Sequence, residues 1–180
     1  VTPFLAQKDI KLRGLHNIEN LLAAAAAVWG EVPVEAIQKV GSTFTGVEHR
    51  IEPVRVLDGV TYYNDSIGTS PTRTIAGLRS FDQKVILIAG GYDKHIPYEP
   101  LAPEVIAHVK NLVLMGATGP RIEKAVCEHP DFAASGLTIQ HADTMQHAVE
   151  LARAAAQPGD IIILSPASAS FDLYPNFEVR

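Results

Sequence analysis

"KVILIAGGYDK", residues 84 to 94, is the stretch that decides the fold. A short run of aliphatic residues ends in two glycines, and a polar loop that contains a lysine follows. Three further apolar runs are NLVLMG (111–116), TIQ (138–140) and DIIILSP (160–166). Because short and strongly apolar runs are typical of strands buried on both faces, they predict a mostly parallel β-sheet.

Helical patterns separate these strands. They are PTRTIAGLRSF (71–81), ATGPRIEKAVCEH (117–129) and DTMQHAVELARAAA (143–156). Strands that alternate with helices predict an α/β domain with a doubly wound, Rossmann-like sheet. Residues 49–64 alternate apolar and polar positions around Asp58-Gly59, a strong hairpin signal, so we expect a β-hairpin at the start of this domain.

The first part of the chain has a different pattern. Residues 14–30 and 33–44 predict two helices, the second with Pro33 in its first turn. Since the pattern changes near residue 47, we expect two parts: a helical remnant of one domain over residues 1–46 and an α/β domain over residues 47–180.

Composition excludes several classes of function. Lys and Arg number 15 against 20 Asp and Glu, a net charge of -5, so the chain has no basic field for nucleic acid or anionic lipid. The start, VTPFLAQKD, is unlike a signal peptide, and no run approaches the ~20 apolar residues of a membrane span. The single Cys127 cannot form an internal disulfide and is expected to be buried or half-buried. These features favour the cytoplasm.

Ligands of such sheets bind beyond the carboxyl ends of the strands. Four polar loops follow predicted strands: NDSIGTSPT (64–72), GGYDKHIPY (90–98), GATGPR (116–121) and SPASASFDLYPNF (165–177). The glycines before Lys94 let the backbone approach a ligand, although a solvated lysine after a tight turn is an alternative. Hydroxyls and backbone N–H groups at a strand-to-helix turn could bind anions in the last loop, or the serines could be helix caps and turn formers.

Two other sites are candidates. Asn17 and Asn20 lie three residues apart near a helix start, where their amides could contact a base such as adenine, or Asn17 could be the N-cap. His49 and Arg50 lie at the expected boundary, where the arginine could bind phosphate, or the segment could be a solvated linker. The seven histidines form neither an HExxH pair nor a Cys/His cluster, so no metal site is predicted.

In their order, these motifs resemble one family. G-x-H-N-x-x-N-x-x-A-A, F-x-G-x-x-H-R-x-E, Y-N-D-S, GG-x-D-K and L-S-P-A-x-A-S-F-D-x-x-x-N-F-E follow one another from about Leu12 to Arg180 as in the Mur ligases of peptidoglycan synthesis. The last motif is most similar to the D-glutamate-adding members. The resemblance implies the C-terminal part of a three-domain ligase, with the tail of the central ATPase domain over residues 1–46 and the amino-acid-binding domain over residues 47–180.

The resemblance also implies a reaction. The full-length ligase would use ATP and Mg²⁺ to activate the carboxylate of UDP-N-acetylmuramoyl-L-alanine as an acyl phosphate, which the amine of D-glutamate then attacks. The P-loop, the magnesium-binding carboxylates, the modified lysine and the UDP-sugar domain are missing from this chain, so we expect it to be inactive alone. Its implied partners are these substrates and the missing domains of the same protein.

The resemblance assigns roles to individual residues. The D-glutamate contacts are Thr69, Lys94, Ser170, Phe171 and Phe177, and the nucleotide contacts are Asn17, Asn20, Arg50 and Asp65. One departure is Ile67, where many members have a lysine near the substrate carboxylate, and Arg73 is a possible substitute. Alternatives are a stand-alone amino-acid-binding or regulatory module, and another Mur ligase or folylpolyglutamate synthase-type domain. The absence of G-x-G-x-x-G after a strand disfavours a dinucleotide-binding oxidoreductase.

Overall fold

The computed structural model describes residues 3–180 of the chain and shows two compact units. The contacts divide the chain between Val47 and Glu48, one residue from the expected boundary. That the first unit belongs to an ATPase domain stays a prediction.

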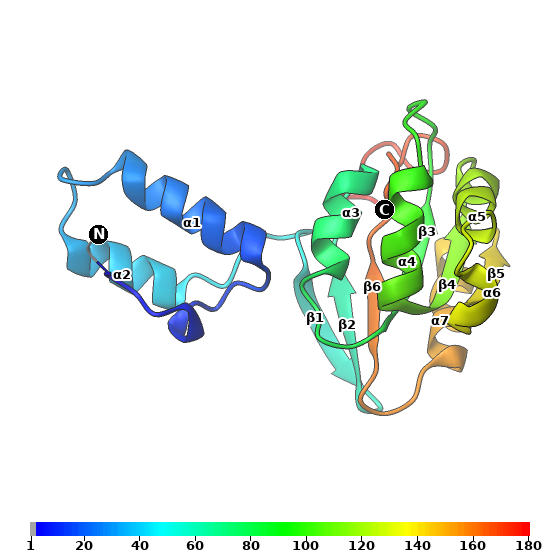
Figure 1. Cartoon of the computed structure of the whole chain (residues 1–180), viewed down its shortest axis with the longest axis horizontal. Helices are drawn as coiled ribbons and strands as arrows, with labels where there is room; N and C mark the ends of the chain where they lie inside the picture. Colours follow the sequence, from blue (N-terminus) through cyan, green and yellow to red (C-terminus); the bar gives the residue numbers. More distant parts are fainter. Residues whose placement is uncertain (1–2) are drawn as a thin grey trace. The chain divides into compact units, whose positions relative to one another are not determined.

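The first unit consists of helices. A 3₁₀ turn, η1 (Gln7–Asp9), precedes α1 (Leu15–Ala27) and α2 (Val34–Thr43) (Figure 1). The alanine run of α1 has the highest intrinsic helix propensity, and Pro33 is the N-cap of α2. Both predicted helices are confirmed. An apolar groove in this unit is lined by Ala24, Ala25, Val28, Val32, Ala36, Ile37 and Val40.

The second unit begins with the predicted hairpin. Strands β1 (Glu52–Leu57) and β2 (Val60–Asn64) pair antiparallel through a two-residue turn. Asp58 and Gly59 have φ angles of 53° and 78°, so both central residues of the turn are left-handed. A turn of this kind matches the right-handed twist of the strands, which is why the Asp-Gly dipeptide specifies the hairpin.

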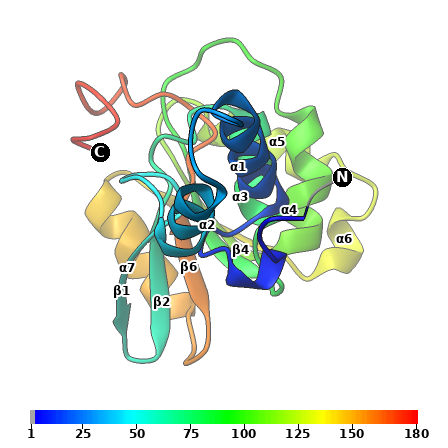
Figure 2. The same cartoon turned by 90° about the vertical axis from the view of Figure 1, so that its left-hand side faces the viewer.

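The remaining strands join β2 in one parallel sheet. They are β3 (Val85–Gly90), β4 (Val109–Met115), β5 (Thr138–Ala142) and β6 (Ile161–Leu164). The order is β1-β2-β6-β3-β4-β5, and only β1 runs antiparallel to its neighbour. Figure 2 shows β1, β2 and β6 side by side. All six residues of the central strand β3 are buried, as its unbroken apolar sequence requires.

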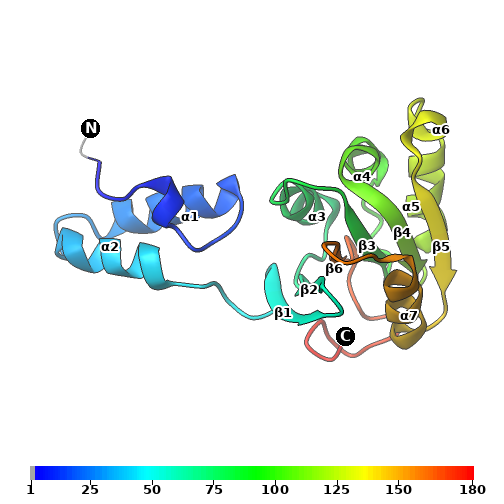
Figure 3. The same cartoon turned by 90° about the horizontal axis from the view of Figure 1, so that it is seen from below.

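Helices cover both faces of this sheet, which confirms the doubly wound class. On one face lie α3 (Pro71–Leu78), α4 (Ala102–His108), α5 (Gly119–Cys127) and α6 (Phe132–Ser135), with the 3₁₀ turn η2 (Glu99–Leu101) before α4, and on the other lies α7 (Met145–Ala155) (Figure 3). Each face has its own core. Leu78, Val105 and Ile122 belong to the larger one, whereas Ala148 and Ala152 of α7 belong to the smaller.

Three details differ from the sequence prediction. Helices α4 and α6 were not predicted, because each is short and α4 follows two prolines within six residues. No helix follows β6 among the described residues, so the expected strand-to-helix turn is wrong. Pro166 and Pro175 and the left-handed Ala167 (φ 55°) favour turns there. Cys127 is exposed rather than buried, since Ile122 and Val126 of α5 face the core and Cys127 follows on another face.

Candidate functional site

The loops after β2, β3, β4 and β6 meet at one edge of the sheet. Backbone hydrogen bonds join each loop to the next one across the sheet. Ala167 N–H donates to Gly68 O at 2.9 Å, Tyr92 N–H to Ala169 O at 2.8 Å, and Thr118 N–H to Gly91 O at 2.9 Å. The edge is the carboxyl end of the five parallel strands, where the sequence predicted the site.

Two glycines allow this close approach. A Cβ at Gly91 would lie 2.2 Å from Ala169 O, and one at Gly116 would lie 2.8 Å from the Cα of Gly91. Both residues also have positive φ angles, 148° and 66°. The glycines after β3 and β4 therefore serve the packing of the loops against one another.

A buried hydroxyl cluster lies beneath these loops. Ser168 Oγ is 2.8 Å from both Tyr98 Oη and Thr118 Oγ1, and Thr118 Oγ1 accepts a bond from Gly91 N–H at 2.9 Å. Ser168 and Thr118 are fully buried. Because each hydroxyl has a partner, the cluster holds the three loops together at little desolvation cost. Tyr98 and Thr118 were not predicted, and no sequence motif marks them.

The predicted D-glutamate contacts come from three of these loops. Lys94 is exposed, and its Nζ lies 3.5 Å from Oγ1 of the half-buried Thr69. Ser170 is 2% exposed, whereas Phe171 is 66% exposed and its ring meets Tyr92 edge to face at 6.1 Å. The structure therefore brings a cation, two hydroxyls and an exposed aromatic ring to one edge of the sheet.

Phe177 lies beside the segment that opens the second unit. Its half-buried ring meets the His49 ring edge to face, with centroids 5.6 Å apart. Asn64 Nδ2 donates to His49 Nδ1 at 2.9 Å, and Ile67 N–H donates to His49 O at 3.2 Å. The loops after β2 and β6 thus both hold the His49 segment, so it is not a solvated linker.

Arg50 lies between two left-handed residues. His49 and Ile51 have φ angles of 62° and 46°, and such an angle is rare for a β-branched residue. Arg50 Nε is buried and has no hydrogen-bond partner among the described residues. A buried guanidinium N–H without a partner is an available donor, which suits an anionic ligand such as phosphate.

Asp65 is buried, with 4% of its surface exposed. Its Oδ1 accepts a bond from Ile51 N–H at 3.2 Å, and its Oδ2 accepts one from Ser165 Oγ–H at 2.6 Å. Burial raises the pKa of this carboxyl to about 6, although both hydrogen bonds and the charges of Arg50 and Arg73 act in the opposite direction. In this structure Asp65 holds Ile51 and Ser165, and its predicted contact with a ribose stays a prediction.

Asn17 and Asn20 lie together on α1 of the first unit. Gly14, not Asn17, is the N-cap, so the capping alternative is wrong. Asn17 Nδ2 instead donates to Arg13 O at 2.7 Å, and Asn20 Nδ2 lies 3.4 Å from Asn17 Oδ1. Asn17 is 8% exposed and Asn20 is exposed, so the outer amide is accessible to a ligand.

Over residues 3–180, no group of three or more His, Cys, Asp or Glu side chains is placed to hold a metal ion. None of the helices described in this range is long and apolar enough to cross a membrane.

Comparison with known proteins finds one matching family model and relatives of high sequence identity. The family model "Mur ligase, glutamate ligase domain" matches residues 49–168. UDP-N-acetylmuramoylalanine–D-glutamate ligase of Clostridium beijerinckii is 54% identical over 172 residues, which are 96% of this chain and 38% of that protein. The protein of the same name from Acetivibrio thermocellus is 54% identical over 181 residues, 99% of this chain and 39% of that protein.

Solved structures share the fold. Mycobacterium tuberculosis folylpolyglutamate synthase, complexed with ADP, superposes with a TM-score of 0.64 at 15% identity over 88% of this chain and 39% of that chain. A murein peptide ligase from Psychrobacter arcticus gives 0.57 at 19% identity over 88% of this chain and 35% of that chain. The chain thus spans less than two fifths of the length of these relatives.

Proposed function

We propose, from the premise that this chain belongs to the Mur ligase family, that it forms the C-terminal part of a ligase that adds D-glutamate to UDP-N-acetylmuramoyl-L-alanine. The 54% identity to D-glutamate ligases over nearly the whole chain supports this substrate. The reaction belongs to peptidoglycan synthesis and takes place in the cytoplasm. The geometry that carries the proposal is the approach of Lys94 Nζ to Thr69 Oγ1, 3.5 Å apart on two loops. Both loops are hydrogen-bonded through their backbones to the loop after β6, which contains Ser170.

D-glutamate has two carboxylates, which a protein of net charge -5 must bind with local donors. Lys94 contributes the positive charge, and Thr69 and Ser170 contribute hydroxyl donors. The backbone N–H of Phe171 is a further donor, and Phe177 packs beside the site. Holding the amino acid in place lowers the barrier to its attack, because a bound and oriented amine reacts as if it were part of the acceptor.

ATP, with Mg²⁺, supplies the phosphoryl group that activates the acceptor carboxylate. Arg50 is the residue of this chain best suited to a phosphate, since its buried Nε has no other partner among the described residues. Asn17 and Asn20 are proposed to contact adenine, and Asp65 the ribose. The chain contains no GxxxxGK[ST] loop, so we propose that it hydrolyses no ATP and makes no amide bond alone.

Replacing Lys94 tests the site. In the complete ligase that carries this chain, Lys94→Ala should raise the KM for D-glutamate by about tenfold or more, as expected for the loss of a charge-assisted contact worth about 1.5 kcal/mol or more. The KM for ATP should change less than twofold. Lys124→Ala is the matched control, because Lys124 is exposed on α5 and pairs only weakly with Glu128 at 3.8 Å.

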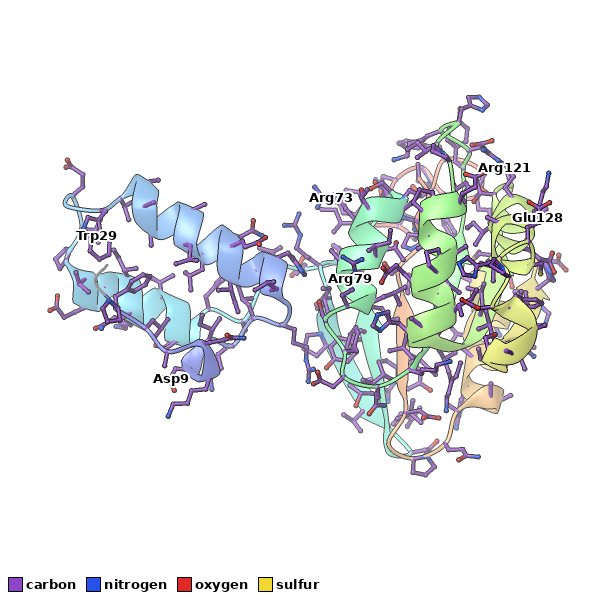
Figure 4. The ribbon with its side chains drawn as sticks, viewed as in Figure 1. Asp9, Trp29, Arg73, Arg79, Arg121 and Glu128 are labelled. Carbon is purple, nitrogen blue, oxygen red and sulfur yellow. The ribbon has the colours of Figure 1, made fainter. Side chains whose placement is uncertain are left out.

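Two further measurements complete this test. Arg73 is exposed on the first turn of α3 (Figure 4), and if it replaces the lysine expected at Ile67, Arg73→Ala should also raise the KM for D-glutamate. An unchanged KM would remove Arg73 from the site. Submillimolar binding of D-glutamate to the isolated chain, measured by calorimetry, would instead favour the stand-alone binding module.

A further inference from the structure

Arg180 lies against two of the loops that carry the proposed D-glutamate contacts. Its Nη2 donates to Ser66 O at 2.7 Å, and its Nε donates to Ser66 Oγ at 3.1 Å. Its Nη1 donates to Ser168 O at 3.1 Å. The guanidinium therefore bridges the loop after β2 and the loop after β6 by three hydrogen bonds.

These anchor points lie close to the proposed ligands in sequence. Ser66 is three residues before Thr69, and Ser168 is two residues before Ser170. Ser66 and Ser168 are 1% and 0% exposed, so both anchors are in the protein interior. Ser66 Oγ–H also donates to Phe177 O at 2.7 Å. This bond connects Phe177, another proposed D-glutamate contact, to the same bridge.

The charge of Arg180 persists in this environment. Burial lowers its pKa to about 10, against the opposing influence of Asp172 and Tyr174. A pKa in this range leaves the guanidinium protonated at neutral pH, so its bonds are charge-assisted and stronger than neutral ones. Asp172, which faces this charge, also accepts a hydrogen bond from Ala117 N–H at 3.1 Å through its Oδ2. This bond connects the loop after β4 to the loop after β6.

The bridge differs from the other contacts between these loops. The bond from Ala167 N–H to Gly68 O joins backbone to backbone. The bridge instead requires the planar fork of an arginine, because three N–H groups point to acceptors on two loops. A lysine has one nitrogen and cannot reach the same three acceptors.

We propose that Arg180 is a positioning residue for D-glutamate: its guanidinium sets the separation of the Thr69 and Ser170 loops. This inference rests on the proposed function, since it assigns Arg180 a role in that same site. Displacing one loop moves the donors away from the substrate carboxylates, and small misplacements of binding groups reduce rates strongly. No contact of Arg180 with the substrate is required.

The test uses the complete ligase with two variants and one control. Arg180→Ala removes the bridge, and Arg180→Lys keeps the charge but not the fork. Arg79→Ala is the matched control, because Arg79 is exposed and pairs with Glu104 of α4 (Figure 4). The readouts are KM for each substrate, kcat, and hydrogen–deuterium exchange of residues 66–70 and 168–174.

Arg180→Ala should raise the KM for D-glutamate about tenfold and Arg180→Lys about fivefold, with KM for ATP within twofold of the parent and faster exchange in both loops. Arg79→Ala should change neither the KM values nor the exchange rates of the two loops. A role in folding alone would reduce kcat through the active fraction and leave every KM unchanged, and that result would overturn the inference. If Arg180→Ala does not fold, Arg180→Lys decides: a KM for D-glutamate within twofold of the parent contradicts the proposal.

The two proposals fail separately. A parent ligase that adds no D-glutamate would overturn the proposed function. An active parent whose Arg180 variants keep the parent KM and the parent exchange rates would overturn only the positioning role.

Discussion

The two units differ in where their large apolar side chains lie. In the first unit Leu15, Leu22 and Val40 are 69%, 52% and 56% exposed, and the buried apolar residues of its helices are Ala25 and Ile37. In the second unit Leu112 and Ile163, among many others, are fully buried. The comparison teaches that regular helices do not make a domain; a domain needs elements that bury one another's apolar faces.

Local preference explains the first unit. α1 forms because alanine and leucine favour the helix, not because a core surrounds it. We propose that these exposed apolar side chains form a surface that the rest of an ATPase domain, which the family resemblance implies, covers in the complete ligase. The second unit buries a core on each face of its sheet.

Separating the units gives the largest expected effect. A fragment of residues 48–180 should unfold in one cooperative transition, because both cores lie within it. A fragment of residues 1–47 should show no cooperative transition, since isolated short helices are marginal in water. Circular dichroism during urea titration measures both. A cooperative transition in the 1–47 fragment would contradict the comparison.

Single core substitutions should show the same contrast on a smaller scale. Leu112→Ala removes a fully buried side chain of β4 and should lower the free energy of unfolding by about 2–5 kcal/mol. Leu22→Ala on α1, where the side chain is 52% exposed, should change it by less than about 0.5 kcal/mol. Urea denaturation of the whole chain gives both values, and equal losses would show that the first unit has a core of its own.

The pH dependence of stability tests the buried carboxyl of the second unit. The pKa of Asp65 is raised from 3.8 to about 6, so the folded state favours its neutral form. The stabilisation is fully present below the unfolded-state pKa and is lost as the pH rises through about 6. Relative to Asp65→Asn, which does not titrate, the parent should lose up to about 3 kcal/mol between pH 4 and pH 7.

Urea denaturation of the 48–180 fragment at four pH values measures this difference. Asp82→Asn, at an exposed position, is the control and should follow the parent at every pH. A constant difference between the parent and Asp65→Asn would mean that Asp65 titrates in the folded state as it does in the unfolded chain.

The sequence predicted those features whose signals lie within a few neighbouring residues. The unbroken apolar run of β3, the Asp58-Gly59 turn and the glycines before Lys94 each specify backbone geometry over a few residues, and the structure has the strand, the hairpin and the tight turn there. The order of the motifs indicated the family, to which the matched model assigns the chain. The individual site roles stay predictions.

The tertiary structure decided what depends on residues far apart in the chain. Arg180 lies 114 positions from Ser66, and its role as a bridge has no sequence signal because it exists only when two loops meet. Asp65 is 100 positions from Ser165, so its burial and its raised pKa follow from packing. Local preferences form the strands and turns, whereas the long-range contacts determine which polar groups lose water and which partners replace it.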